Sequence, residues 1–334
     1  QDAFLNGSDP RLLSQRISGL ISGRTPQGGS VELTLDPVGQ EVAYQALQRG
    51  AGQGPFVGSV AAVRPSTGEV LALASSPSFD PGALSSQDQN VRTEAMAQIE
   101  ANPDRPLLNH ATQQALPPGS TMKVITTAAA LEQGMGPDTP VSGADRTLLP
   151  GTSTYLQNYA GQTCGGGTVT LRTAFELSCN VPFVELSQDI GDEAFAEMSG
   201  KFGLDGAAPE DFGIPVAPSG LGAMDDAAQL AMSSIGQSDV RMTTLQNAMV
   251  AATVSNGGVR MQPQLIKTLT APDLSVVKGF TPRDAGRVLT DEQAGTLTEL
   301  MVGAEAHAGG DLPGVTVASK TGTAEHGVGA SESL

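Results

Sequence analysis

Ser120 and Lys123 form a Ser-x-x-Lys pair that could carry out acyl transfer. Two prolines and a glycine precede the serine and an apolar run follows it, so we predict a helix over 120–132 with Ser120 at its N-terminus. There the helix dipole favours developing negative charge, and the i, i+3 spacing places Lys123 on the same face as the serine. A neutral lysine can activate a serine hydroxyl as a general base. Alone the pair is weak, because a capping serine and a surface lysine give the same pattern.

A second pair of polar residues, Ser178 and Asn180, lies at a predicted break between two helical stretches. A hydroxyl and an amide two residues apart at a break can project together into a cleft. The alternative is a capping serine and an asparagine in a turn.

A third motif, Lys-Thr-Gly-Thr, lies at the end of a strand predicted over about 315–323. Lys320 offers a cation, Thr321 and Thr323 offer hydroxyls for a carboxylate, and Gly322 lets a ligand backbone approach the strand. The alternative is a strand-to-turn junction with a surface lysine. The chain has five lysines, and two of them occupy positions in these motifs. Chance is therefore a poor explanation for the three motifs together.

The elements that must hold these motifs alternate between strand and helix patterns. A strand is predicted at 30–35, a helix from Pro37 with Asp36 as its N-cap, and a β-hairpin over 56–75. From 85 to about 258 the pattern is mostly helical, with strand character at 259–270 and a helix starting after a Thr290 capping box. Strands at both ends with helices between them predict an α+β fold.

Net charge, apolar runs and histidine content argue against several classes of binding site. The formal charge is −17, which argues against nucleic acid or an anionic membrane surface as a partner. No run approaches the ~20 apolar residues of a membrane span. Three scattered histidines predict no metal site.

The order Ser-x-x-Lys, Ser-x-Asn, Lys-Thr-Gly resembles the class B penicillin-binding proteins, in particular those of actinobacteria. The segments VELTLDPVGQEVAYQAL, GSVAAVRPSTGEVLALASSPSFDP, LPPGSTMKVITTAAALE, IGQSDVRMTTLQNAMVAATVSNGG and VASKTGTAE are similar to family patterns, over nearly all of 30–326. The resemblance implies a five-stranded antiparallel sheet flanked by helices, plus an all-helical subdomain at roughly 85–258. By the same resemblance, the family's last strands are expected after the Lys-Thr-Gly motif and are not contained in residues 1–334.

The resemblance also implies a function, peptidoglycan cross-linking by a D,D-transpeptidase that β-lactam antibiotics inhibit. Ser120 would be acylated by the D-Ala-D-Ala end of a stem peptide, with Lys123 as base and Ser178 passing a proton to the leaving group. Asn180 would hold the substrate amide, and Lys320, Thr321 and Thr323 its carboxylate. The expected partners are stem peptides, β-lactams and other cell-wall synthesis proteins, with no cofactor and no nucleic acid.

By the same resemblance, residues 30–334 are the transpeptidase domain, and 1–29 are a linker and the remnant of an N-terminal pedestal domain. The protein is expected outside the cytoplasm, tethered to the cell membrane by an anchor not in this chain. An oxidising compartment favours a Cys164–Cys179 disulfide, with two free thiols as the alternative.

Three other functions share these motifs. A D,D-carboxypeptidase differs only in using water to release the acyl group, and the sequence leaves it open. A non-catalytic β-lactam sensor domain would keep the same residues. A serine β-lactamase would need a dedicated deacylating base, and no segment places a glutamate for that role.

Overall fold

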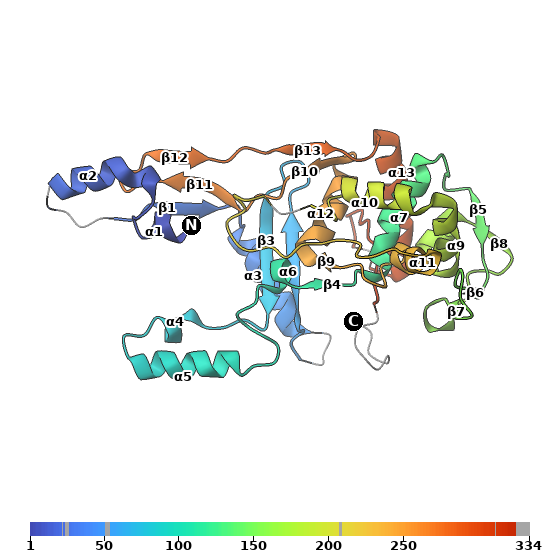
Figure 1. Ribbon diagram of the computed structural model, residues 1–334, viewed down its shortest axis with the longest axis horizontal. Helices are drawn as coiled ribbons and strands as arrows, with labels where there is room; N and C mark the ends of the chain where they lie inside the picture. Colours follow the sequence, from blue (N-terminus) through green and yellow to red (C-terminus); the bar gives the residue numbers. More distant parts are fainter. Residues whose placement is uncertain (22, 24–26, 51–53, 207–208, 311, 325–334) are drawn as a thin grey trace. The chain divides into compact units, whose positions relative to one another are not determined.

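The computed structural model describes residues 1–21, 23, 27–50, 54–206, 209–310 and 312–324. The fold is α+β, with helices and small antiparallel sheets (Figure 1). It divides into two compact units. The first contains residues 1–113, 208–216 and 261–284, and the second contains 114–207, 217–260 and 285–334. The helical subdomain predicted at roughly 85–258 overlaps mainly with the second unit.

The first unit contains a three-stranded antiparallel sheet in the order β1-β11-β12. These strands span Ser30–Leu33, Ile266–Thr270 and Val276–Gly279. Phe4 and Leu12 are fully buried in an apolar cluster with residues of β11. They belong to the short helices α1 (Asp2–Leu5) and η1 (Pro10–Leu12), which α2 (Leu13–Ile21) follows.

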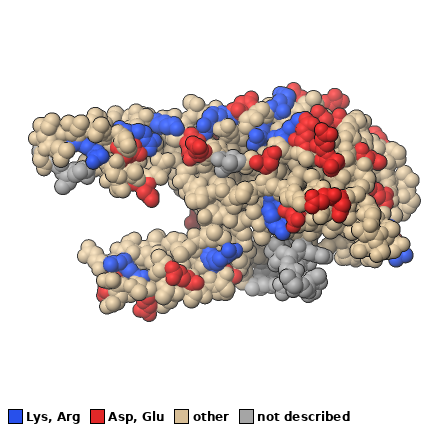
Figure 2. All heavy atoms as spheres, in the orientation of Figure 1, with Lys and Arg blue, Asp and Glu red and all other residues tan. Residues whose placement is uncertain are grey.

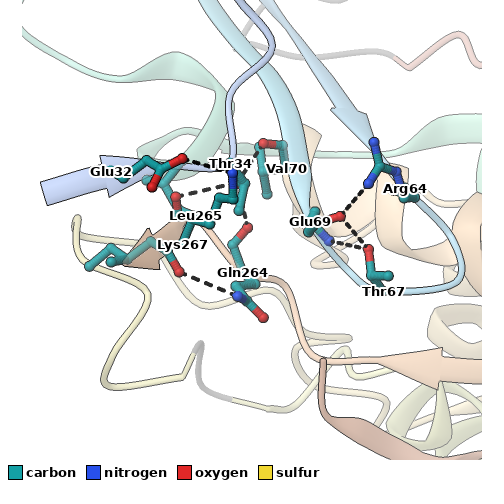
Figure 3. A network of polar contacts seen from close by, with 10 residues as sticks. Glu32, Thr34, Arg64, Thr67, Glu69, Val70, Gln264, Leu265 and Lys267 are labelled. Atoms are coloured by element: carbon teal, nitrogen blue, oxygen red, sulfur yellow. Dashed lines mark hydrogen bonds and ion pairs between the residues drawn. The ribbon is translucent and has the colours of Figure 1, made fainter. Parts of the chain in front are cut away.

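Thr34, just after β1, joins three segments of this unit (Figure 3). Its buried hydroxyl lies 2.7 Å from the carbonyl oxygen of Val70 and 3.0 Å from that of Gln264. The single hydroxyl proton can serve one acceptor at a time, while the Thr34 N–H donates to the carbonyl of Leu265 at 2.9 Å. The threonine thus links the end of β1 to β3 (Val70–Ser76) and to the segment before β11.

The sequence signals for the next elements are confirmed. Helix α3 (Pro37–Arg49) begins after Asp36, whose carboxylate accepts from the Gly39 N–H at 2.7 Å, and it ends at Gly50. The predicted hairpin is β2 paired with β3, and α3 packs on it. The remaining elements of this region are β2 (Gly58–Val63), α4 (Pro81–Leu84), α5 (Gln89–Glu100) and α6 (His110–Gln113).

The second unit is mainly helical, and its core consists of aliphatic side chains, methionines and phenylalanines. Helix α11 packs on α9, α10 packs on α7, and α13 packs on both α7 and α8. On the face shown in Figure 2, acidic side chains gather over the helices of this unit, as the charge of −17 leads one to expect. The helices are α7 (Lys123–Glu132), α8 (Leu171–Glu176), α9 (Val181–Ile190), α10 (Asp192–Lys201), α11 (Ala227–Ser234), α12 (Thr244–Ser255) and α13 (Asp291–Ala308).

Three short strand pairs complete the second unit, β4 with β9, β5 with β8 and β6 with β7. Their bounds are Ala115–Leu116 with Met242–Thr243, Pro140–Ser142 with Thr168–Thr170, and Arg146–Leu148 with Tyr155–Gln157. Strands β10 (Val259–Met261) and β13 (Asp284–Arg287) run across the limits of the two units.

Two expectations differ from the structure. The described residues form sheets of two and three strands and no five-stranded sheet. The strand predicted over about 315–323 is also not formed, because this segment pairs with no neighbouring strand among the described residues and a strand needs a partner for its N–H and C=O groups. Separately, none of the described helices has the length and apolar character needed to cross a membrane.

Candidate active site

Ser120 lies in the turn that leads into the most deeply buried helix of the second unit. It belongs to the 3₁₀ turn η2 (Gly119–Met122), and the α-helix itself begins at Lys123, three residues later than predicted. Such turns are frequent at helix N-termini, where the first N–H groups have no intrahelical partner. The serine is partly exposed and Lys123 is fully buried.

Ser178 and Asn180 lie between α8 and α9, as the predicted break requires. Ser178 has a φ of +58°, in the left-handed region that a non-glycine residue rarely adopts. This backbone turns the Ser178 carbonyl toward Lys123, whose Nζ donates to it at 2.7 Å. The same Nζ donates to Asn180 Oδ1 at 2.8 Å, so the first two motifs are in direct contact.

The surroundings of Lys123 favour a neutral amine. Burial lowers the pKa of Lys123 well below its ordinary value, and repulsion by Lys320 is the second cause. A neutral amine has two N–H donors and one lone pair. The Ser178 and Asn180 oxygens can accept from both N–H groups, which leaves the nitrogen lone pair available to accept a proton. Within the described residues no hydrogen bond joins Ser120 Oγ to Lys123 Nζ, and such bonds are often loose in an unliganded enzyme.

Lys320 completes the contact between the three motifs. Its Nζ donates to Ser178 Oγ at 2.6 Å and to the Thr321 carbonyl at 3.2 Å. Burial lowers the pKa of Lys320 to about 8, so the group remains mostly charged at neutral pH. The preceding residue, Ser319, donates from its hydroxyl to Glu305 and from its N–H to the Met301 carbonyl at 3.1 Å, both on α13.

Three glycines allow the segments around Ser120 to approach closely. A Cβ on Gly322 would lie 2.8 Å from the Pro118 carbonyl oxygen, so this glycine makes room for the turn before Ser120. Close approach of a ligand backbone to Gly322 stays a prediction beside this packing reason. Gly119 has a φ of +55° and lies against the Thr323 backbone, while Gly236 has a φ of +74° and accepts from the Gly119 N–H at 3.0 Å.

A cleft of about 850 Å³ opens beside these residues. Five of the predicted site residues line it: Ser120, Ser178, Asn180, Thr321 and Thr323. Sequence reasoning missed several other lining residues, among them Tyr155, Asn158, Tyr159, Gln237 and His307. Only Gln237 had a signal, since it lies in one of the segments with a family pattern. The rest lie in β7, in η3 or directly between them, and in the last turn of α13, and nothing in the sequence marks them.

The two cysteines are joined in the structure. Cys164 and Cys179 form a disulfide with their Cα atoms 6.2 Å apart, and Cys179 stands between the two polar residues of the second motif. The bridge ties this motif to the segment that follows η3 (Tyr159–Gly161). Among the described residues, no group of three or more potential metal ligands comes together.

Comparison with known proteins agrees with this geometry. The family described as penicillin binding protein transpeptidase domain matches residues 58–333. The peptidoglycan D,D-transpeptidase PbpA of Mycolicibacterium smegmatis is 47% identical over 330 residues, which cover 98% of this chain and 67% of that protein. PbpA of Mycobacterium tuberculosis is 46% identical with the same coverage.

Solved structures show the same similarity. The structure of penicillin-binding protein A from M. tuberculosis as a penicillin G acyl-enzyme complex superimposes with a TM-score of 0.92 at 46% identity, covering 98% of this chain and 74% of that one. The imipenem acyl-enzyme complex of that protein gives a TM-score of 0.93. This chain therefore belongs to the penicillin-binding protein transpeptidase family.

Proposed function

We propose that this chain is a peptidoglycan D,D-transpeptidase that forms an acyl-enzyme at Ser120 with the D-Ala-D-Ala end of a stem peptide. One observation carries the proposal most directly. Lys123 reaches Ser178 and Asn180 while Lys320 reaches the hydroxyl of the same Ser178, so residues from three distant segments form one hydrogen-bonded cluster beside a cleft.

In the proposed acylation, the neutral amine of Lys123 accepts the Ser120 proton as Oγ attacks the carbonyl carbon of the penultimate D-Ala. The backbone N–H groups of Ser120 and Thr323 would hold the oxyanion, and the backbones of Gly119 and Thr323 are in contact. Ser178 would then pass a proton to the departing D-Ala amine. The C–N bond breaks, and the acyl group stays on Ser120 as an ester.

Recognition of the terminal carboxylate is assigned to Lys320, Thr321 and Thr323. A charged lysine at the cleft and two hydroxyls suit a carboxylate. Asn180 would contact the substrate amide through its Nδ2 group, because its Oδ1 is held by Lys123. An amine from a second stem peptide would release the acyl group, and β-lactams would acylate the same serine. No step of this reaction requires a metal or an organic cofactor.

The domain organisation and the location of the protein are also part of the proposal. Residues 30–334 would be the transpeptidase domain, with 1–29 joining it to a pedestal. The enzyme would act outside the cytoplasm, tethered to the cell membrane and working with other cell-wall synthesis proteins. The Cys164–Cys179 bridge supports this location, because disulfides persist in oxidising compartments.

The test is intact mass spectrometry after incubation with benzylpenicillin, beside a Ser120→Ala variant. We expect one stable penicillin adduct on the native protein and none on the variant. A thioester analogue of D-Ala-D-Ala with and without an amine acceptor then separates the alternatives. Transfer to the amine supports the transpeptidase, hydrolysis alone supports a carboxypeptidase, and an inert acyl-enzyme supports a sensor. Folded protein without any adduct would overturn the proposal.

A further inference from the structure

Asn158 is a buried residue outside all three motifs, and its side chain makes three hydrogen bonds beside the second one. It lies between β7 and η3 and is 3% exposed. Its Oδ1 accepts from the backbone N–H groups of Asn180 at 2.8 Å and Val181 at 3.0 Å. Its Nδ2 donates to the Ala144 carbonyl at 3.1 Å.

These contacts replace a helix cap that is otherwise missing. Helix α9 begins at Val181, and the first N–H groups of a helix have no partner within it. An asparagine at the N-cap position normally satisfies one of them with its own side chain. Asn180 occupies that position here, but its side chain makes no capping bond. The carbonyl oxygen of Asn158 takes the role instead, from a position 22 residues earlier.

Capping by Asn158 leaves the Asn180 side chain available for another partner. Asn180 Oδ1 accepts from Lys123 Nζ at 2.8 Å, and Asn180 Nδ2 lies 3.4 Å from the Gln157 carbonyl. A further bond holds the same region, from Gln162 Nε2 to the Leu177 carbonyl at 3.0 Å. Without Asn158, the N–H groups of Asn180 and Val181 would lose their acceptor, and the backbone that places the Asn180 side chain against Lys123 would lose the two bonds that hold it.

We propose that Asn158 is a positioning residue for acylation: by capping α9 from outside, it keeps the Asn180 amide on Lys123 and so directs the amine lone pair toward Ser120. This inference rests on the proposed function, in which Lys123 is the base. Asn158 acts through Asn180, whose backbone N–H group it holds. The two asparagines thus have separate roles: Asn158 caps α9, and Asn180 holds the Lys123 amine.

The experiment measures the second-order rate constant for acylation by benzylpenicillin in Asn158→Ala, with the fold checked by circular dichroism. We expect a loss of about 10- to 100-fold, within the range for a buried donor left without its acceptor. Asn158→Asp keeps an acceptor oxygen toward both N–H groups but turns its second oxygen onto the Ala144 carbonyl, so it should recover only part of the lost rate. If Asn158→Ala does not fold, Asn158→Ser takes its place, and its acylation rate constant should also be lower than the native one.

A double-mutant cycle with Asn180→Ala tests the route of the effect. If Asn158 acts through Asn180, Asn158→Ala adds little to the loss already caused by Asn180→Ala. The matched control is Thr243→Ala, which removes the cap of α12, where the Thr243 hydroxyl accepts from the Gln246 N–H at 3.1 Å. It should lower stability to a similar extent and leave the acylation rate unchanged.

The outcomes separate this inference from the proposed function. Absence of an adduct on the native protein overturns the proposed function. Normal acylation of native protein together with a native rate in folded Asn158→Ala overturns the inference alone. So does a loss in Asn158→Ala that adds fully to that of Asn180→Ala, or an equal loss in the Thr243→Ala control.

Discussion

Replacing Gly322 with alanine tests how closely the Lys-Thr-Gly segment must approach the turn that carries Ser120. Gly322 has no positive φ, so alanine fits the backbone conformation and only the space is at issue. The new Cβ would lie 2.8 Å from the Pro118 carbonyl oxygen and 3.0 Å from Thr121 Cγ2. These two groups are fixed to each other, because the Thr121 hydroxyl donates to that carbonyl at 2.9 Å. The segment that carries Gly322 must therefore move.

The size of the movement follows from ordinary contact distances. Relieving the contact with the carbonyl oxygen requires a shift of about half an ångström, and misplacing reacting groups by ~1 Å can cost about 100-fold in rate. We therefore expect Gly322→Ala to slow acylation by benzylpenicillin by about tenfold or more. Overpacking should lower the free energy of unfolding by about 1–3 kcal/mol.

Gly295→Ala is the matched control for Gly322→Ala. Gly295 lies inside α13, has no positive φ, and a Cβ there would meet nothing within 4 Å. The same added methyl group should raise the free energy of unfolding by about 1 kcal/mol, because alanine is the better helix former, and leave acylation unchanged. Urea unfolding and stopped-flow acylation measure both quantities. A native acylation rate in Gly322→Ala would show that the reaction does not require the close approach of the Lys-Thr-Gly segment to the turn that carries Ser120.

Three further predictions concern pH, a helix cap and the disulfide. The acylation rate constant should rise with pH as Lys123 becomes neutral and fall above about pH 8 as Lys320 loses its charge. Lys320→Arg should remove the fall at alkaline pH. A rate constant that does not change with pH contradicts the roles of both lysines. Both lysines have lowered pKa values when folded, so between about 8 and 10.5 the unfolded chain binds more protons, and urea unfolding should show stability rising with pH in that window. Thr290→Ala removes the capping box of α13 and should cost about 1 kcal/mol in urea unfolding, with Thr290→Ser close to native; equal stability of the two variants would speak against the cap. Loss of the Cys164–Cys179 bridge in a double serine variant should cost about 3 kcal/mol by the loop-entropy relation, and unchanged unfolding would show that the bridge does not constrain the unfolded chain.

Local signals predicted local structure well. Asp36 before a proline, Thr290 three residues before a glutamine, and glycine after α3 each act within one helical turn, and the helices begin or end where these residues indicate. The strand at 315–323 failed for the opposite reason. A strand depends on pairing with another segment, and the described residues provide none for it.

The sequence by itself determined the chemistry available, because residue type and order identify Ser120, Lys123 and Lys320 without any coordinates. Only the tertiary structure decided how these groups act on one another. The burial that lowers the pKa of Lys123 comes from helices packed around α7, and the two acceptors of its Nζ lie 55 and 57 residues away. Asn158 carries no sequence signal at all, since a loop asparagine becomes a helix cap only when folding brings its carbonyl oxygen to the free N–H groups of α9.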